Sequence, residues 1–201
     1  MAEPILFIAG LGRCGTTMVM RMLDRGGIPV AGPRPSYEDD HMRMMAPLAW
    51  RTGWVLEQAG KAVKWIDPQN APLDWNTWTG GPVSFLLLRR DSEHQAKSSA
   101  KLVGMKLSKA GVAEMAQSLR TSQKKVEAYL ESAGNVYDAG FEWILKEPVQ
   151  AAQKLAAICR KELGKELDIE AAAAAVIRRT PWCAPDLAIE EFLLAEENER
   201  G

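Results

Sequence analysis

The sequence is poor in cysteine and in long apolar runs. Cys14, Cys159 and Cys183 are widely spaced and odd in number, so they show neither a disulfide framework nor a metal-ligand spacing. The opening residues lack a basic segment, and their apolar run is too short for a signal peptide or a membrane span. The cysteine pattern favours a reducing compartment, and we expect a cytoplasmic protein.

The chain also lacks a dominant charge. Its 201 residues carry a formal net charge of −1, so neither nucleic acid nor an acidic membrane is expected as a partner. No internal repeat is visible, and AAAAA at 171–175 is the one low-complexity run. The length predicts a single compact domain over residues 1–201, which is enough chain to bury a hydrophobic core.

The most informative motif follows a short apolar segment near the amino end. Residues 5–9 are apolar and partly β-branched, as in a strand of a parallel sheet that is covered on both faces. Gly10 and Gly15 then have GxxxxG spacing, which lets the backbone between them turn its amide hydrogens inward. A helix expected over Thr16 to Arg25 adds the positive end of its dipole. Such a loop can hold a phosphate or a sulfate.

The loop departs from the nucleotide triphosphatase pattern at its lysine. That pattern places Lys and then Ser or Thr directly after the second glycine, whereas Thr16 follows Gly15 here. The cation of this loop is Arg13 instead. A small P-loop kinase is one alternative, with Asp91 as its magnesium aspartate, although Thr16 argues against it. A strand-to-helix turn that binds nothing is another.

A second apolar strand is expected over Val83 to Leu88, and charged residues follow it directly. Ligands of open α/β sheets bind at the carboxyl ends of the strands, which is where Arg89 and Arg90 would lie. A helix expected from Ser92, with Ser92 as its N-cap, carries Ser98 about two turns along. A guanidinium and a hydroxyl together suit a phosphate. The alternative is a solvated arginine pair on an exposed turn.

Three segments, in the correct order, resemble the sulfotransferase family. The run from Arg13 to Thr17 resembles the family's 5′-phosphosulfate loop, and Arg90 with Ser98 resembles its 3′-phosphate pair. Residues 134–164 resemble the segment that runs through YEDL and a proline into a helix, with Phe141 in place of the tyrosine. The resemblance implies a P-loop nucleotide-hydrolase-like fold. Alternating strands and helices independently predict a three-layer α/β/α fold with a parallel sheet.

The resemblance also implies an activity. A sulfotransferase moves a sulfuryl group from 3′-phosphoadenylyl sulfate (PAPS) to a hydroxyl or amine, here of a small-molecule or glycan acceptor. Arg13 would replace the loop lysine that contacts the transferred group, and no metal is predicted. The implied donor-binding residues are Arg13, Cys14, Gly15, Thr16, Thr17, Arg90, Ser98 and Phe141. A non-catalytic nucleotide-binding module with a reduced acceptor site is a further alternative, because the chain is short for a full sulfotransferase and lacks adenine-side residues of the family.

The base that takes the acceptor's proton is expected shortly after the first helix. Glu38 is the first candidate, because related enzymes place a Glu or a His in this part of the chain. His41 is the second, because an imidazole titrates near neutral pH. The alternative is that Asp39 or Asp40 caps a helix expected over 40–49, with Glu38 solvated.

Tryptophan is concentrated between the two phosphate elements, where an acceptor pocket would lie. The residues are Trp50, Trp54, Trp65, Trp75 and Trp78. Most are expected in the core, whereas Trp75 or Trp78, on a loop expected over Asp67 to Pro82, could stack on a ligand. A helix is expected over Gly53 to Trp65. Its Lys64 could face an anionic acceptor, but a place on the solvent side of the helix is favoured. Further helices are expected over residues 110–132, 148–164 and 169–178, and from residue 186.

Overall fold

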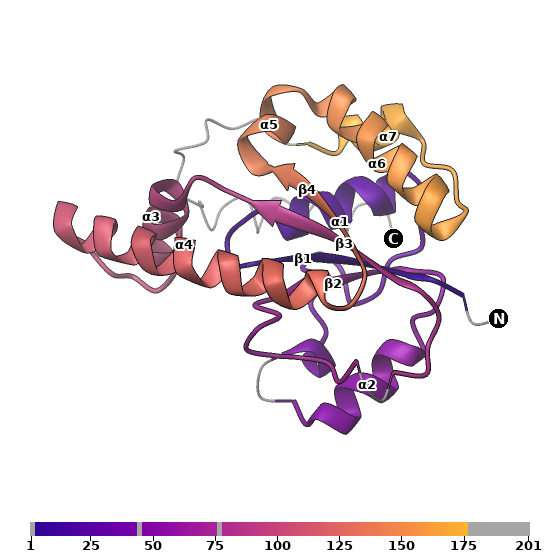
Figure 1. Ribbon diagram of the computed structural model, residues 1–201. Coiled ribbons are helices and arrows are strands. Elements are labelled where there is room, and N and C mark those ends of the chain that lie inside the picture. Colours follow the sequence, from indigo (N-terminus) through magenta and orange to yellow (C-terminus); the bar gives the residue numbers. More distant parts are fainter. Residues whose placement is uncertain (1–2, 44–45, 76–77, 177–201) are drawn as a thin grey trace.

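The computed structural model describes residues 3–43, 46–75 and 78–176 (Figure 1). Its centre is a parallel four-stranded sheet with the strand order β2-β1-β3-β4. The strands are β1 (Ile5–Gly10), β2 (Ala62–Ile66), β3 (Val83–Arg89) and β4 (Asn135–Gly140). Helices cover both faces of the sheet, so the predicted three-layer α/β/α fold is confirmed.

The register of the strands brings their carboxyl ends to one edge. Gly10 at the end of β1 lies between Ile66 of β2 and Leu88 of β3. Arg89, at the end of β3, lies beside Gly140 of β4. The segments that follow all four strands therefore start next to one another, as ligand-binding loops do in open α/β sheets.

One face of the sheet is covered by α1 (Thr16–Arg25), α5 (Phe141–Lys146), α6 (Pro148–Leu163) and α7 (Ile169–Ala174). α1 has its predicted bounds. α6 starts with its proline in the first turn, and the left-handed Gly164 (φ 64°) ends it. The residues after 176, with Cys183 and the helix expected from residue 186, lie outside the described residues. None of the helices in the described part of the chain has the length and apolar character needed to cross a membrane.

The other face is covered by α2 (Leu48–Leu56) and α4 (Lys109–Glu131), and its core is aromatic. Phe7 stacks on Phe85 with 5.5 Å between ring centroids, and Trp65 lies 5.1 Å from Phe7. Trp75 packs edge-on against Phe85 at 5.8 Å, and Trp78 in turn lies 5.8 Å from Trp75. Core packing therefore accounts for both loop tryptophans, rather than the ligand stacking expected for one of them.

The helix predicted over Gly53 to Trp65 is wrong. α2 ends at Leu56, and the chain then passes through Gly60, at φ 77°, into β2. The physical reason is the alternation within β2, where Val63 and Trp65 enter the aromatic core. The helix expected over 40–49 is also wrong, because a short 3-10 turn, η1 (Asp40–Met42), precedes α2. Residues 44–45 are not described.

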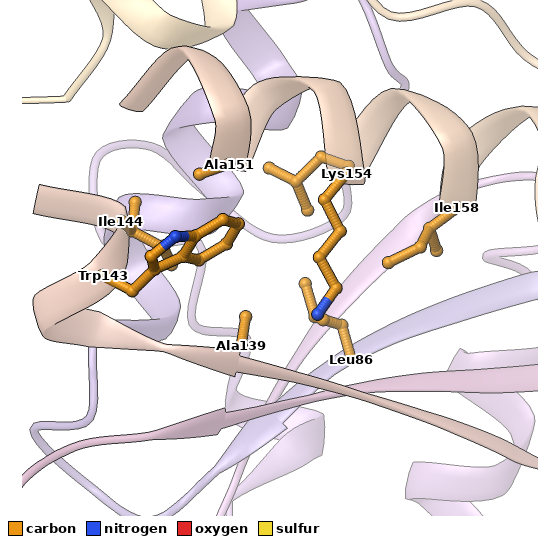
Figure 2. Close-up of a pocket in the computed structure, with 8 residues that line it drawn as sticks. Leu86, Ala139, Trp143, Ile144, Ala151, Lys154 and Ile158 are labelled. Atoms are coloured by element: carbon orange, nitrogen blue, oxygen red, sulfur yellow. The ribbon is translucent and has the colours of Figure 1, made fainter. Parts of the chain in front are cut away.

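A small hollow lies between α6 and the sheet (Figure 2). It has a volume of about 10 Å³, close to that of one water-sized sphere. Its lining residues are Leu86, Ala139, Trp143, Ile144, Ala151, Lys154, Leu155 and Ile158. The ammonium of Lys154 lies 5.7 Å from the Trp143 ring and donates to the carbonyl of Asp138. The hollow is too small and too apolar for a polar ligand, so it is a packing gap.

Phe85→Ala tests the aromatic core. Phe85 is fully buried and meets three other rings, so its truncation should lower the free energy of unfolding by about 3–5 kcal/mol. Urea unfolding followed by circular dichroism measures the change. The control is Val149→Ala on α6, where the side chain is 53% exposed. A loss below about 1 kcal/mol for Phe85→Ala would contradict the packing described here.

Candidate functional site

Two glycines allow other residues to pack closely against the backbone of the loop between β1 and α1. A Cβ atom on Gly10 would lie 2.5 Å from the Cys14 sulfur, and one on Gly15 would lie 2.5 Å from the Phe141 ring. Gly15 also has φ 104°, which L side chains rarely adopt. No side chain caps α1, and the first amides of a helix have no acceptor within the helix. The loop therefore has the form of an anion cradle.

Two residues with a strained backbone lie in or against this loop. In the described part of the chain, the non-glycine residues with positive φ are Arg13 (67°), Tyr37 (55°) and Asp67 (50°). Arg13 is within the loop, and the amide of Asp67 donates to the carbonyl of Gly10 at 2.9 Å. Residues held in this costly region occur at ligand sites more than elsewhere.

Helix α3 (Ser92–Leu102) is attached to the loop by polar side chains. The Nε of Arg13 donates to the hydroxyl of Ser98 at 3.3 Å. Gln95 donates to the carbonyl of Gly12 at 2.7 Å, and Arg90 donates to the carbonyl of Arg13 at 3.0 Å. The two predicted phosphate elements, about 80 residues apart in the sequence, therefore lie in direct contact.

Phe141 completes this arrangement from the end of β4. The guanidinium of Arg90 lies 4.5 Å from the centroid of the Phe141 ring, and its Nε is 3.9 Å from the Glu142 carboxylate. Arg89 turns the other way and pairs with Glu127 and Asp138. Arg90 is thus directed to the loop, while its neighbour belongs to a surface ion-pair network. All the predicted donor-binding residues lie on the loop, in the first turn of α1, or against them.

The N-cap of α3 differs from the prediction. Asp91, not Ser92, accepts from the amides of Glu93 (3.1 Å) and His94 (2.9 Å). Either residue type can cap a helix, and the non-helical backbone of Asp91 (φ −50°, ψ 125°) decides the position. The carboxylate that a kinase would use for magnesium is therefore occupied in helix capping.

The position of Lys64 differs from the favoured prediction. It lies on β2 with its side chain 1% exposed, not on the solvent side of a helix. Its ammonium donates at 2.7 Å to each of the Thr17 hydroxyl, the Ser36 carbonyl and the Glu38 carboxylate. Burial lowers its pKa, and the attraction of Glu38 opposes that shift. Lys64 therefore links Glu38 to the first turn of α1.

The second candidate base lies elsewhere. His41 hydrogen-bonds through Nδ1 to Asp39 at 2.6 Å and stacks on the ring of Trp54 at 5.7 Å. Trp50, with 61% of its surface exposed, lies 4.9 Å from the imidazole. Asp39 caps η1 by accepting from the amide of His41, as the capping alternative predicted. His41 therefore belongs to an aromatic cluster with Trp50 and Trp54 of α2. Glu38 instead bonds to Lys64, which contacts Thr17 at the start of α1.

Asp67 is a site residue that the sequence reasoning missed. It directly follows β2, and its carboxylate accepts from the amide of Gly12 at 3.4 Å. Burial raises the pKa of Asp67, and this hydrogen bond partly offsets that rise. The signal for both Asp67 and Lys64 was available once AVKWI was recognised as a strand, because its carboxyl end meets the loop.

Three cationic side chains, Arg13, Lys64 and Arg90, lie close enough at the site to affect one another. Burial is the main reason that the pKa values of Lys64 and Arg90 are lowered, and repulsion from Arg13 lowers both further. A bound anion would relieve that repulsion. Burial raises the pKa of the Cys14 thiol to about 12, so Cys14 is not a thiolate nucleophile at neutral pH. Among the described residues, no three His, Cys, Asp or Glu side chains gather in a group that could hold a metal ion.

Comparison with known proteins identifies the fold. No family model and no curated protein matches the sequence. The sulfotransferase domain of the Synechococcus PCC 7002 olefin synthase is 16% identical with a TM-score of 0.55, and the match covers 94% of this chain and 83% of that one. Sulfotransferase STF1 from Mycobacterium tuberculosis is 14% identical with a TM-score of 0.52, covering 87% and 71%. A Janibacter sugar kinase reaches a TM-score of 0.37, too low to show a shared fold. The chain has the sulfotransferase-type fold.

Asp67→Asn tests the environment of the carboxylate beside the loop. The pKa of Asp67 is raised above 3.8, so the folded protein binds the carboxyl proton of Asp67 more tightly than the unfolded chain does. Asp67 therefore makes folding less favourable as the pH rises from 3.8 through the raised pKa. The amide keeps an acceptor for Gly12 and cannot ionise. The stability of Asp67→Asn relative to the native protein should rise across that pH range and then level off.

Urea unfolding at a series of pH values measures the Asp67→Asn effect. A difference in the free energy of unfolding that is the same at every pH would contradict the buried setting of Asp67.

Proposed function

We propose that this chain is a sulfotransferase-like enzyme that moves a sulfuryl group from PAPS to a hydroxyl or amine of a small-molecule or glycan acceptor. The observation that carries the proposal is the hydrogen bond between Arg13 of the loop and Ser98 of α3, with Arg90 bonded to the same loop residue. Two phosphate-binding elements in one site suit a donor with phosphate groups at both its 5′ and 3′ positions.

The residues present fit such a donor. The loop amides and the first turn of α1 suit the 5′-phosphosulfate, because both direct N–H groups and positive potential at an anion. Arg90 and the buried hydroxyl of Ser98 suit the 3′-phosphate, because a guanidinium and a hydroxyl both donate to it. Phe141 offers a ring for stacking on adenine.

The transfer itself needs three groups. The acceptor oxygen or nitrogen forms a bond to sulfur while the bond from sulfur to the bridging oxygen breaks, leaving adenosine 3′,5′-bisphosphate. Arg13 stabilises the charge that develops on the leaving phosphate. Glu38 accepts the acceptor's proton. Lys64 holds the Glu38 carboxylate at 2.7 Å and so fixes its orientation relative to the loop.

The kinase alternative has less support. Thr16 occupies the position where ATP-binding loops have lysine, and Asp91 caps α3. A non-catalytic nucleotide-binding module would keep the donor site and lack turnover. Donor binding and turnover therefore have to be measured separately.

Arg90→Ala tests the donor site. The native protein should bind adenosine 3′,5′-bisphosphate in calorimetry more tightly than ATP with magnesium. Loss of hydrogen bonds from a charged donor should weaken bisphosphate binding by about tenfold to a hundredfold. The control is Arg120→Ala on α4, where the exposed arginine bonds only within its own helix to Gln117 among the contacts described. Binding of ATP with magnesium but not of the bisphosphate would overturn the proposal.

Glu38→Gln tests the base. Gln keeps the size and one acceptor for Lys64 but cannot take a proton, so turnover should fall by about 10²–10⁴-fold while bisphosphate binding stays near the native value. Turnover is followed as bisphosphate released from PAPS in the presence of phenolic and glycan acceptors. His41→Gln is the matched comparison, and it should keep most of the activity. Native turnover in Glu38→Gln would exclude Glu38 as the base.

A further inference from the structure

The turn between α3 and α4 exposes a run of large apolar side chains. Residues 101–106 are all exposed. Leu102 is 50% exposed, Val103 is 64% exposed and Met105 is 57% exposed. Single exposed apolar residues need no explanation, but several on one short turn point to a contact surface.

This turn has a defined conformation. Gly104 is left-handed (φ 70°) and its amide donates to the carbonyl of Lys101, while the Met105 amide donates to the carbonyl of Ala100 at 2.8 Å. These two bonds form a Schellman motif that ends α3. Ser108 then caps α4 by accepting from the amide of Gly111 at 3.1 Å. The apolar side chains are therefore presented outward by a hydrogen-bonded turn.

The charge around the turn has one sign. Residues 97–109 contain no acidic residue, and their lysines are Lys97, Lys101, Lys106 and Lys109. All four side chains are on exposed residues. The net charge of the whole chain is −1, and the expectation of no attraction to acidic membranes rested on that value. The net charge does not reflect this local cluster of lysines. We call residues 97–109 the basic apolar tip.

The tip lies at an extremity of the molecule. Figure 1 shows α3 and the beginning of α4 extending beyond the carboxyl edge of the sheet. A projecting apolar turn with lysines around it can place its apolar side chains among lipid acyl chains while the ammonium groups meet anionic headgroups. We propose that the basic apolar tip docks the protein on an anionic lipid surface. Charge complementarity selects this partner, because anionic headgroups would supply counter-charges to Lys101, Lys106 and Lys109, whereas Lys97 already lies 3.9 Å from Glu93.

Vesicle sedimentation with the full chain tests the proposal. The native protein should sediment with vesicles of equal parts phosphatidylcholine and phosphatidylglycerol, and not with phosphatidylcholine alone. Lys101→Gln with Lys106→Gln should weaken that binding by roughly fivefold per lysine. Leu102→Ser with Met105→Ser should weaken it by at least about tenfold, because less apolar surface is buried.

Matched controls separate the tip from general surface effects. Lys124→Gln with Lys125→Gln removes two exposed lysines from the other half of α4, and Val149→Ser removes an exposed apolar side chain from α6. These variants should bind vesicles like the native protein. Circular dichroism reports whether the tip variants are folded without reference to donor binding, so failure of the enzyme proposal would not alter the vesicle result.

Three results would overturn the docking proposal. The first is no sedimentation of the native protein with the mixed vesicles. The second is equal binding by the tip variants and the controls. The third is self-association in analytical ultracentrifugation that Leu102→Ser with Met105→Ser abolishes, in a protein that does not bind vesicles, because the tip would then contact a second copy of the chain.

Discussion

The hydrogen bond between Arg13 and Ser98 joins the two halves of the candidate site. Arg13 belongs to the loop that leaves β1, and Ser98 belongs to the helix that follows β3. The bond depends on the pairing of β1 with β3, because adjacent parallel strands place the segments that follow them side by side at the edge of the sheet. Gly15 leaves room for Phe141 beside the loop, because a Cβ there would lie 2.5 Å from the Phe141 ring. The position of each candidate phosphate-binding group therefore follows from the topology of the sheet and from this close packing.

The buried ammonium of Lys64 connects a second pair of candidate site residues, Thr17 and Glu38. Lys64 gives up hydration to lie on β2, and three acceptors at 2.7 Å compensate that loss. Two of them are the Thr17 hydroxyl at the start of α1 and the Glu38 carboxylate. A single side chain thus connects the candidate base to the helix that starts the anion cradle. Removing such a partner from a buried charge network is costly, so the position of Glu38 depends on β2.

The sequence predicted those parts of the fold whose signals are local. Two buried apolar runs, a pair of glycines and the helical spacing after Pro148 were sufficient for β1, β3, the loop and α6. β2 was missed because AVKWI is short and follows a helix without a clear boundary. The position of Lys64 and the part played by Asp67 were missed with it. The aromatic core shows a second limit, since a loop tryptophan can stack on a ligand or on Phe85, and only the tertiary structure decides. The roles assigned to the site residues stay predictions.

A crystal structure with adenosine 3′,5′-bisphosphate is the most direct test of the central claim, that the loop and α3 form one site for a doubly phosphorylated nucleotide. The 5′-phosphate should lie on the amides between Gly12 and Thr17, and the 3′-phosphate should contact both Arg90 and Ser98, with adenine against Phe141. A nucleotide that places its 5′-phosphate in the loop but leaves its 3′-phosphate away from Arg90 and Ser98, or that binds elsewhere, would contradict the claim.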